Sequence, residues 1–247
     1  MSGEISVNNL NVSYADKEVI KNVSFSFQTG KLIGIIGPNG AGKSTMIKAA
    51  LGLISKKSGT ITFEGKSLEA VRKKIAYVPQ RSNIDWDFPI IVQDTVLLGT
   101  YPKLGVFHRP AKKEKLWAKE CLEKVGMADF AKRQIGELSG GQQQRVFLAR
   151  ALAQEAEYFF LDEPFVGIDV SSEKVIIDIL KELKAAGKTI FVVHHDLGKV
   201  EAYFDDLILL NGELVGAGPV REVFCNEKIQ QAYQTSHIQL TGLGVGV

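Results

Sequence analysis

Residues 31–51 read KLIGIIGPNGAGKSTMIKAAL, and this stretch decides the fold class. Its short apolar run at 32–36 is typical of a strand buried in a parallel sheet. The turn after it fits the pattern G-x-x-x-x-G-K-[ST], and the residues beyond the turn predict a helix. In that context the backbone N–H groups of the turn point inward and bind phosphate groups. The predicted phosphate-binding residues are Gly37, Pro38, Asn39, Gly40, Ala41, Gly42, Lys43, Ser44 and Thr45.

Two side chains of this loop and two carboxylates elsewhere predict nucleotide hydrolysis. Lys43 is expected to neutralise the β- and γ-phosphates, and Ser44 to bind Mg²⁺. A second buried strand in YFFLDEP, residues 158–164, ends at Asp162 and Glu163. Asp162 is expected to provide a second contact to Mg²⁺, and Glu163 to polarise the water that attacks the γ-phosphate.

Strands and helices are expected to alternate along the rest of the chain. Apolar residues recur at every second position in 22–30, which indicates a half-buried strand. Asn211-Gly212 between two apolar runs predicts a hairpin. In 171–187, apolar residues recur with helical spacing. This predicted face consists of Val175, Ile176, Ile179, Leu180 and Leu183. The alternation predicts an α/β fold, an open and mostly parallel sheet with helices on its faces.

Residues 82–155 differ in kind, because they contain candidate helices at 92–101 and 112–126 and no convincing strand. We interpret them as a helical insert within one domain that spans residues 1–236. The last residues, 237–247, are rich in glycine and are expected to form a poorly ordered tail.

A second helix start is also suited to anions. ELSGGQQQRVFLARAL, residues 137–152, reads as a Ser-Gly-Gly turn that opens a long helix and exposes its first N–H groups. The loop at 37–45 is already expected to bind the phosphates, so the chain does not need this second anion site unless the site contacts a different nucleotide. We therefore expect two copies of the chain to associate head to tail about a twofold axis. Ser139 and Gly141 of each copy would then cap the nucleotide of the other.

Other candidate residues stay ambiguous on the pattern alone. Gln80 ends a predicted strand and either contacts Mg²⁺ and water or only fills the junction with the insert. Tyr14 stacks on an adenine or packs on the sheet edge, and packing is favoured because aromatic residues at strand ends usually belong to the core. His194 and His195 end a strand on opposite faces, which argues against a shared metal ion. One of them is expected to donate to the γ-phosphate, and the preference for His195, which precedes Asp196, comes partly from the resemblance described below.

The composition excludes several classes of protein. The 247 residues include 30 basic and 28 acidic side chains, and a net charge of +2 argues against a general nucleic-acid-coating surface. The two cysteines, far apart in the chain, indicate neither a disulfide framework nor a zinc site. No apolar run approaches the roughly 20 residues that span a bilayer, so any membrane role is expected to be peripheral.

GPNGAGKST, LSGGQQQR, YFFLDEP and VVHHDL occur in this order, and with them the sequence resembles the ATP-binding cassette (ABC) ATPases over residues 3–235. The resemblance implies a P-loop core with an N-terminal antiparallel β portion and a helical insert. It also implies hydrolysis of ATP, with ATP and Mg²⁺ as cofactors. By this resemblance Tyr14 stacks on the adenine, which reverses the preference above, and Gln80 links Mg²⁺ to the transporter contact.

The same resemblance implies roles for the remaining motif residues. Glu163 corresponds to the general base, His195 to the switch histidine and Asp169 to an aspartate that communicates across the dimer. Ile168 stands where the family more often has leucine. The family signature corresponds to Ser139, Gly140, Gly141 and Gln142.

A finer resemblance, carried by residues 77–99 together with DEPFVGID and VVHHDL, is to the ATPase subunits of bacterial manganese, zinc and iron uptake transporters. In that group the segment after Gln80 faces the membrane subunit. Residues 85–89 would then lie near a groove for its coupling helix, unless their aromatic side chains pack back on the insert. The implied partners are a second copy, integral membrane permease subunits and, indirectly, an extracellular or periplasmic metal-binding protein. The implied location is the cytoplasm, on the inner face of the cell membrane.

Manganese is the preferred substrate within this group, with zinc and iron or an iron chelate as alternatives. Two further alternatives are an exporter ATPase and a soluble cassette protein that acts in DNA repair, translation or cluster assembly. A single cassette with a short insert disfavours the soluble class, whose members usually carry coiled-coil inserts or two cassettes.

Overall fold

The computed structural model describes residues 3–15, 17–104 and 108–233, and the chain forms two compact units. The first unit combines residues 1–69 with 192–247, and the second comprises residues 70–191. The tail predicted at 237–247 lies outside the described residues.

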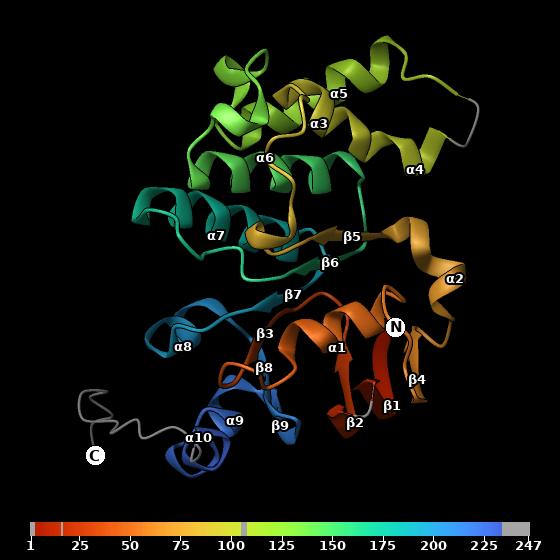
Figure 1. Ribbon diagram of the computed structural model, residues 1–247, viewed down its shortest axis with the longest axis vertical. Helices are drawn as coiled ribbons and strands as arrows, with labels where there is room; N and C mark the ends of the chain where they lie inside the picture. The colour runs from red at the N-terminus through yellow and green to blue at the C-terminus, as the bar shows by residue number, and fades with distance from the viewer. Residues whose placement is uncertain (1–2, 16, 105–107, 234–247) are drawn as a thin grey trace. The chain divides into compact units, whose positions relative to one another are not determined.

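The first unit contains an antiparallel sheet of strands β1 (Glu4–Tyr14), β2 (Lys17–Gln28) and β4 (Ser58–Phe63). Strand β1 lies in the middle, and both neighbours run antiparallel to it (Figure 1). In β2, Val23 and Phe27 are buried while the serines between them are exposed, as the period of two predicts. The N-terminal antiparallel portion is thereby confirmed.

The same unit contains the buried strand β3 (Leu32–Ile36), in parallel register with β8 (Asp206–Asn211). Strand β9 (Glu213–Pro219) returns antiparallel to β8 through Gly212, whose φ of 73° is in the left-handed region. This confirms the predicted hairpin. The helices of the unit are α1 (Lys43–Ala50), η6 (Leu197–Lys199), α8 (Val200–Tyr203), α9 (Val220–Val223) and α10 (Asn226–Tyr233).

The second unit contains β5 (Ile75–Val78), β6 (Tyr158–Leu161) and most of β7 (Thr189–Val193), in that order across the sheet. Strands β5 and β6 are parallel, and every residue of β6 and β7 is buried. The rings of Phe160 and Phe191 stack with their centroids 4.9 Å apart. Buried parallel strands flanked by helices confirm the predicted α/β class.

Helix α7 (Val170–Ala185) follows β6 and buries a wider face than its sequence predicts. Ile176, Ile179 and Leu180 are buried as expected, whereas Val175 and Leu183 are only half-buried. Ile177 is buried as well, so the covered face extends beyond the predicted stripe. The reason is that neighbouring elements, including α6, cover more of the helix than one narrow stripe.

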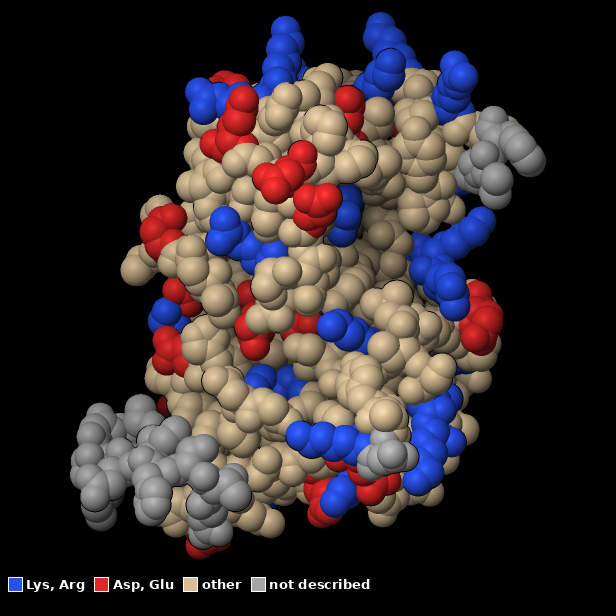
Figure 2. Space-filling model, viewed as in Figure 1, with Lys and Arg blue, Asp and Glu red and all other residues tan. Residues whose placement is uncertain are grey.

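The regular elements among the described residues of 82–155 are helical. Helices α3 (Val92–Leu97), α5 (Lys112–Lys124) and α6 (Gly140–Ala153) pack on one another (Figure 1). Shorter helices complete the unit: α2 (Leu68–Val71), which begins in the first unit, η1 (Arg72–Lys74), η2 (Arg81–Asn83), η3 (Leu98–Thr100), α4 (Tyr101–Leu104), η4 (Ala128–Phe130) and η5 (Ile135–Glu137). Figure 2 shows basic and acidic side chains interspersed on one face, in keeping with the small net charge.

Candidate functional site

The glycine-rich loop of the first unit connects β3 to α1, as predicted. Gly37, Gly40 and Gly42 have φ values of 151°, 81° and 91°, in a region that L side chains rarely adopt. A Cβ on Gly37 would lie 2.0 Å from the carbonyl oxygen of Leu210. The spacing of the glycines therefore follows from a tight backbone path and from the approach of β8.

Lys43 begins α1 and points back across this loop. Its Nζ donates to the carbonyl oxygens of Gly37 and Pro38 at 2.9 Å each, and the residue is only 6% exposed. Ser44 and Thr45 follow in the first turn of α1 and are partly exposed. An ammonium held beside turned backbone and a helix start is suited to an anion such as a phosphate.

The two histidines at the end of β7 differ in environment. His194 is 1% exposed, and its backbone N–H donates to the carbonyl oxygen of Ile35 at 3.0 Å. The centroid of its ring lies 5.6 Å from that of Phe204. His195 is exposed, as expected for neighbours on opposite faces. Among the described residues, no group of three or more His, Cys, Asp or Glu could hold a metal ion.

Tyr14 ends β1 with 48% of its surface exposed. The ring is therefore not buried in the core, which is where aromatic residues at strand ends usually lie. An exposed ring at a strand end is available for stacking, although its contact with an adenine stays a prediction.

In the second unit, Gln80 and Glu163 meet at the ends of the parallel strands β5 and β6. The amide Nε2 of Gln80 donates to the carboxylate Oε2 of Glu163 at 2.6 Å. Glu163 has a φ of 52°, a left-handed conformation that is uncommon for a non-glycine residue. The bond from Gln80 thus holds the carboxylate of a residue on strained backbone, and such backbone is frequent at functional sites.

Asp162 precedes this glutamate and is fully buried. Its backbone N–H donates to the carbonyl oxygen of Val78 at 2.9 Å. Burial, and then the nearby Asp162 carboxylate, raise the pKa of Tyr77 above its usual value of 10.

The second predicted helix start is present and is capped by its own side chains. The Oγ of Ser139 accepts from the N–H of Gln142 at 3.4 Å, and the Oε1 of Gln142 accepts from the N–H of Ser139 at 2.9 Å. This reciprocal capping box is readable from the spacing S-x-x-Q. The family resemblance assigns Gln142 only to the signature, although this spacing by itself also predicts the capping role.

Asp169 caps α7 locally. Its carboxylate accepts from the N–H of Ser172 at 2.9 Å, from the hydroxyl of Ser172 at 2.8 Å and from the hydroxyl of Ser171. These bonds, led by that of Ser171, hold the pKa of Asp169 below its usual value. A Cβ on Gly141 would lie 2.5 Å from the Ser172 hydroxyl, so the start of α6 lies against this cap.

The segment after Gln80 separates its aromatic side chains. Trp86 packs edge-on against Phe147 of α6 with ring centroids 5.5 Å apart, and its Nε1 donates to the carbonyl of Arg81 at 3.0 Å. Phe88 is 59% exposed. Packing on the insert therefore holds for Trp86, whereas Phe88 remains available as an interface residue.

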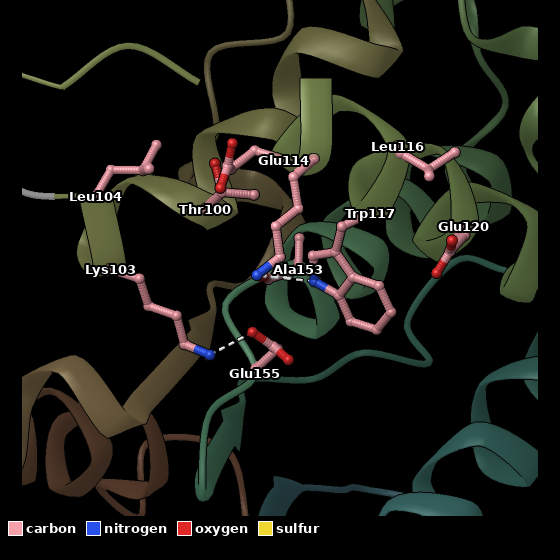
Figure 3. A pocket seen from close by; sticks show the side chains of 10 residues that line it. Thr100, Lys103, Leu104, Glu114, Leu116, Trp117, Glu120, Ala153 and Glu155 are labelled. Atoms are coloured by element: carbon pink, nitrogen blue, oxygen red, sulfur yellow. Dashed lines mark hydrogen bonds and ion pairs between the residues drawn. The ribbon is translucent and has the colours of Figure 1, made fainter. Parts of the chain in front are cut away.

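A cavity of about 400 Å³ lies elsewhere in the second unit, between α4, α5 and the end of α6 (Figure 3). The indole Nε1 of Trp117 donates to the carbonyl of Ala153 at 3.2 Å, and Lys103 pairs with Glu155. The residues that line the cavity include none of the motif residues.

None of the described helices combines the length and apolar character that crossing a membrane requires.

Comparison with known proteins identifies the family. Residues 20–166 match the ABC transporter family, which is more than half of the chain. The manganese transport system ATP-binding protein MntB of Listeria innocua is 59% identical over 93% of this chain and 95% of its own length. The zinc transport system ATP-binding protein TroB of Treponema pallidum is 50% identical over 93% of this chain and 86% of its own.

A solved structure of a nucleotide-free ATP-binding cassette from an ABC transporter has a TM-score of 0.81 and 26% identity. The match covers 94% of this chain and 99% of that one. The glycine-rich loop between β3 and α1, the carboxylate of Glu163 bonded to Gln80 and these matches lead to one conclusion. The chain belongs to the ABC transporter family, as an ATPase of that family.

Proposed function

We propose that this chain hydrolyses ATP to drive manganese uptake through a separate membrane permease. The observation that carries the substrate is the 59% identity, over 93% of the chain, with a manganese transport system ATP-binding protein. The 50% identity with a zinc transport system protein makes zinc the second candidate. The metal is cargo of the permease in this proposal. The chain itself acts at the cytoplasmic face of the membrane, and a metal-binding protein supplies the permease from outside.

The first unit binds the nucleotide in this proposal. N–H groups of the loop 37–45 and the ammonium of Lys43 hold the β- and γ-phosphates, and the exposed ring of Tyr14 stacks on the adenine. His195 donates a hydrogen bond to the γ-phosphate. The burial of Lys43 strengthens its attraction for phosphate, because the surroundings screen charge less than water does.

Glu163 is the general base in the proposed reaction. It accepts the proton of the attacking water as the bond to the γ-phosphorus forms, and the leaving group is ADP. The 2.6 Å bond from Gln80 supports this role, since it orients the carboxylate and leaves the second oxygen for water. A change in the position of Gln80 would therefore change the orientation of the Glu163 carboxylate directly.

The donor set fits Mg²⁺. Ser44, Gln80 and Asp162 offer a hydroxyl, an amide and a carboxylate oxygen, which are the hard ligands that this ion prefers. Mg²⁺ held by these residues would supply positive charge that neutralises the β- and γ-phosphates.

A second copy completes the site in this proposal. The capping box satisfies the N–H of Gln142, and the helix itself offers no partner to the N–H groups of Gly140 and Gly141. Ser139, Gly140 and Gly141 would cap the nucleotide of the other copy, and Asp169 would communicate across the dimer. A Ser139→Arg chain with full, ATP-dependent dimerisation and turnover would contradict this arrangement.

The proposed function is tested by labelled manganese uptake in cells whose only copy of the chain is Glu163→Gln. Uptake should be lost in these cells and restored by the unaltered chain. Unlabelled zinc and iron serve as competitors and report the selectivity. Intact uptake of manganese with loss of zinc uptake would replace the first candidate by the second, and outward movement of the metal would indicate an exporter.

The biochemistry of the same variant separates hydrolysis from binding. Glu163→Gln should bind ATP, stay dimeric and turn over at least about a hundredfold more slowly, because the water loses its base. Lys43→Ala should instead weaken ATP binding and abolish turnover. Near-normal hydrolysis by Glu163→Gln would remove that residue from the base role.

A further inference from the structure

Arg81, the residue after Gln80, is bonded to the helix that carries the second anion site. Its Nε donates to the Oε1 of Gln143 at 2.9 Å, and Gln143 is only 2% exposed. The Nε2 of Gln143 donates to the carbonyl of Ile135 at 3.1 Å. The side-chain amide of Gln143, bonded through both its oxygen and its nitrogen, therefore connects Arg81 to the segment that leads into α6.

The guanidinium of Arg81 also lies against the first residue of α6. A Cβ on Gly140 would be 3.4 Å from Cζ of Arg81 and 3.5 Å from its Nε. Trp86 holds Arg81 from the other side, since its Nε1 donates to the Arg81 carbonyl and its ring centroid lies 5.7 Å from Cζ. Trp86 in turn packs on Phe147, within α6. Arg81 is thus fixed to the first two turns of α6 by side-chain and backbone contacts.

We propose that Arg81 is a positioning residue that holds the helix start Ser139–Gly141 in place relative to Gln80. The two residues are neighbours in the chain, and Gln80 is bonded to Glu163 at 2.6 Å. A displacement of Glu163 or Gln80 is therefore passed through Arg81 and Gln143 to the start of α6, and the reverse also holds. This inference rests on the proposed function, in which Ser139 and Gly141 cap the nucleotide of a second copy.

The geometry supplies a matched pair of variants. The bond uses Nε of arginine, and the amide nitrogen of glutamine is at the same distance along the side chain. Arg81→Gln therefore keeps an N–H donor without the charge, whereas Arg81→Met keeps the length without either. Arg81→Met should lower kcat for ATP about tenfold and weaken ATP-driven dimerisation of the Glu163→Gln chain about tenfold, as expected for one lost bond to a buried acceptor. Arg81→Gln should keep kcat and the affinity of ATP-driven dimerisation within about threefold of the values without a change at Arg81.

Two further measurements separate positioning from general stability. The affinity for a fluorescent ATP analogue, measured on dilute monomer, should stay within about twofold in Arg81→Met, since Lys43 belongs to the other unit. The midpoint of thermal unfolding should stay within about 3 °C. Arg72→Met, an exposed arginine of η1, is the control and should match the unaltered chain.

Three results would overturn the proposal: full activity of Arg81→Met, equal losses in Arg81→Met and Arg81→Gln, or a parallel fall in nucleotide affinity and unfolding temperature. An unaltered chain that neither hydrolyses ATP nor dimerises with it would overturn the proposed function itself. Activity of the unaltered chain together with full activity of Arg81→Met would overturn the role of Arg81 alone.

Discussion

Gly141 at the start of α6 has no room for a side chain, and this can be tested directly. A Cβ at this position would lie 2.5 Å from the hydroxyl and 2.9 Å from the Cβ of Ser172, and 3.1 Å from the Oδ2 of Asp169. Ordinary contacts begin at 3.4 Å, so α6 or α7 would have to move by about 1 Å. Rotation of the Ser172 hydroxyl does not relieve the strain, because the contact with its Cβ remains and the bond to Asp169 is lost.

Overpacking of this kind costs about 1–3 kcal/mol, and the weakened bond from Ser172 to Asp169 adds to this cost. The higher helix propensity of alanine offsets about 1 kcal/mol. We therefore expect Gly141→Ala to destabilise the chain by about 1–3 kcal/mol. For a chain of this size, that lowers the midpoint of thermal unfolding by about 2–10 °C.

The assay is thermal unfolding of Gly141→Ala, Ser172→Gly and the double variant. Ser172→Gly removes both close atoms of Ser172, so the double variant should be more stable than the sum of the two effects by at least about 1 kcal/mol. Gly140→Ala, one residue earlier, meets its nearest atom only at 3.2 Å and should lose less stability. Additive effects within about 0.5 kcal/mol, or an unchanged midpoint in Gly141→Ala, would refute the argument.

Three further predictions follow from burial and charge. The depressed pKa of Asp169 means that its carboxylate stabilises the fold fully above the ordinary value of 3.8, and that this contribution is lost progressively as the pH falls from there through the lower pKa of the folded state. The unfolding free energy of Asp169→Asn, from urea titrations, should thus differ most from the unaltered chain at pH 7 and least near pH 3, and a constant difference would contradict this. Burial raises the pKa of Cys121 to about 12, so Ellman's reagent should modify only the half-buried Cys225 in the folded chain and both thiols in urea, whereas rapid reaction of folded Cys225→Ser would contradict this. Phe88→Ala should leave the unfolding midpoint unchanged and weaken retention on membranes that contain the permease by about fivefold or more; Leu53→Ala, 57% exposed, is the control, and equal retention of the two variants would exclude Phe88 from the interface.

Local patterns were sufficient for most of the fold. The run 32–36 is buried in a parallel pair, and the Asn211-Gly212 dipeptide turns a hairpin, because both signals act over a few adjacent residues. The helix start at Ser139 is equally local, since its cap uses residues within one turn. Spacing did not predict burial that depends on neighbouring elements, as in α7, where Ile177 is buried although it lies outside the predicted stripe.

The sequence by itself determined the chemistry of the candidate site, because motif residues such as Lys43, Asp162 and Glu163 are recognised from their immediate neighbours. Tertiary structure alone decided which distant residues meet. The bond from Gln80 to Glu163 joins residues 83 positions apart, and that from Arg81 to Gln143 joins residues 62 apart. Such pairs leave no local signature, since the contact depends on how strands and helices pack and not on the order of residues within either segment.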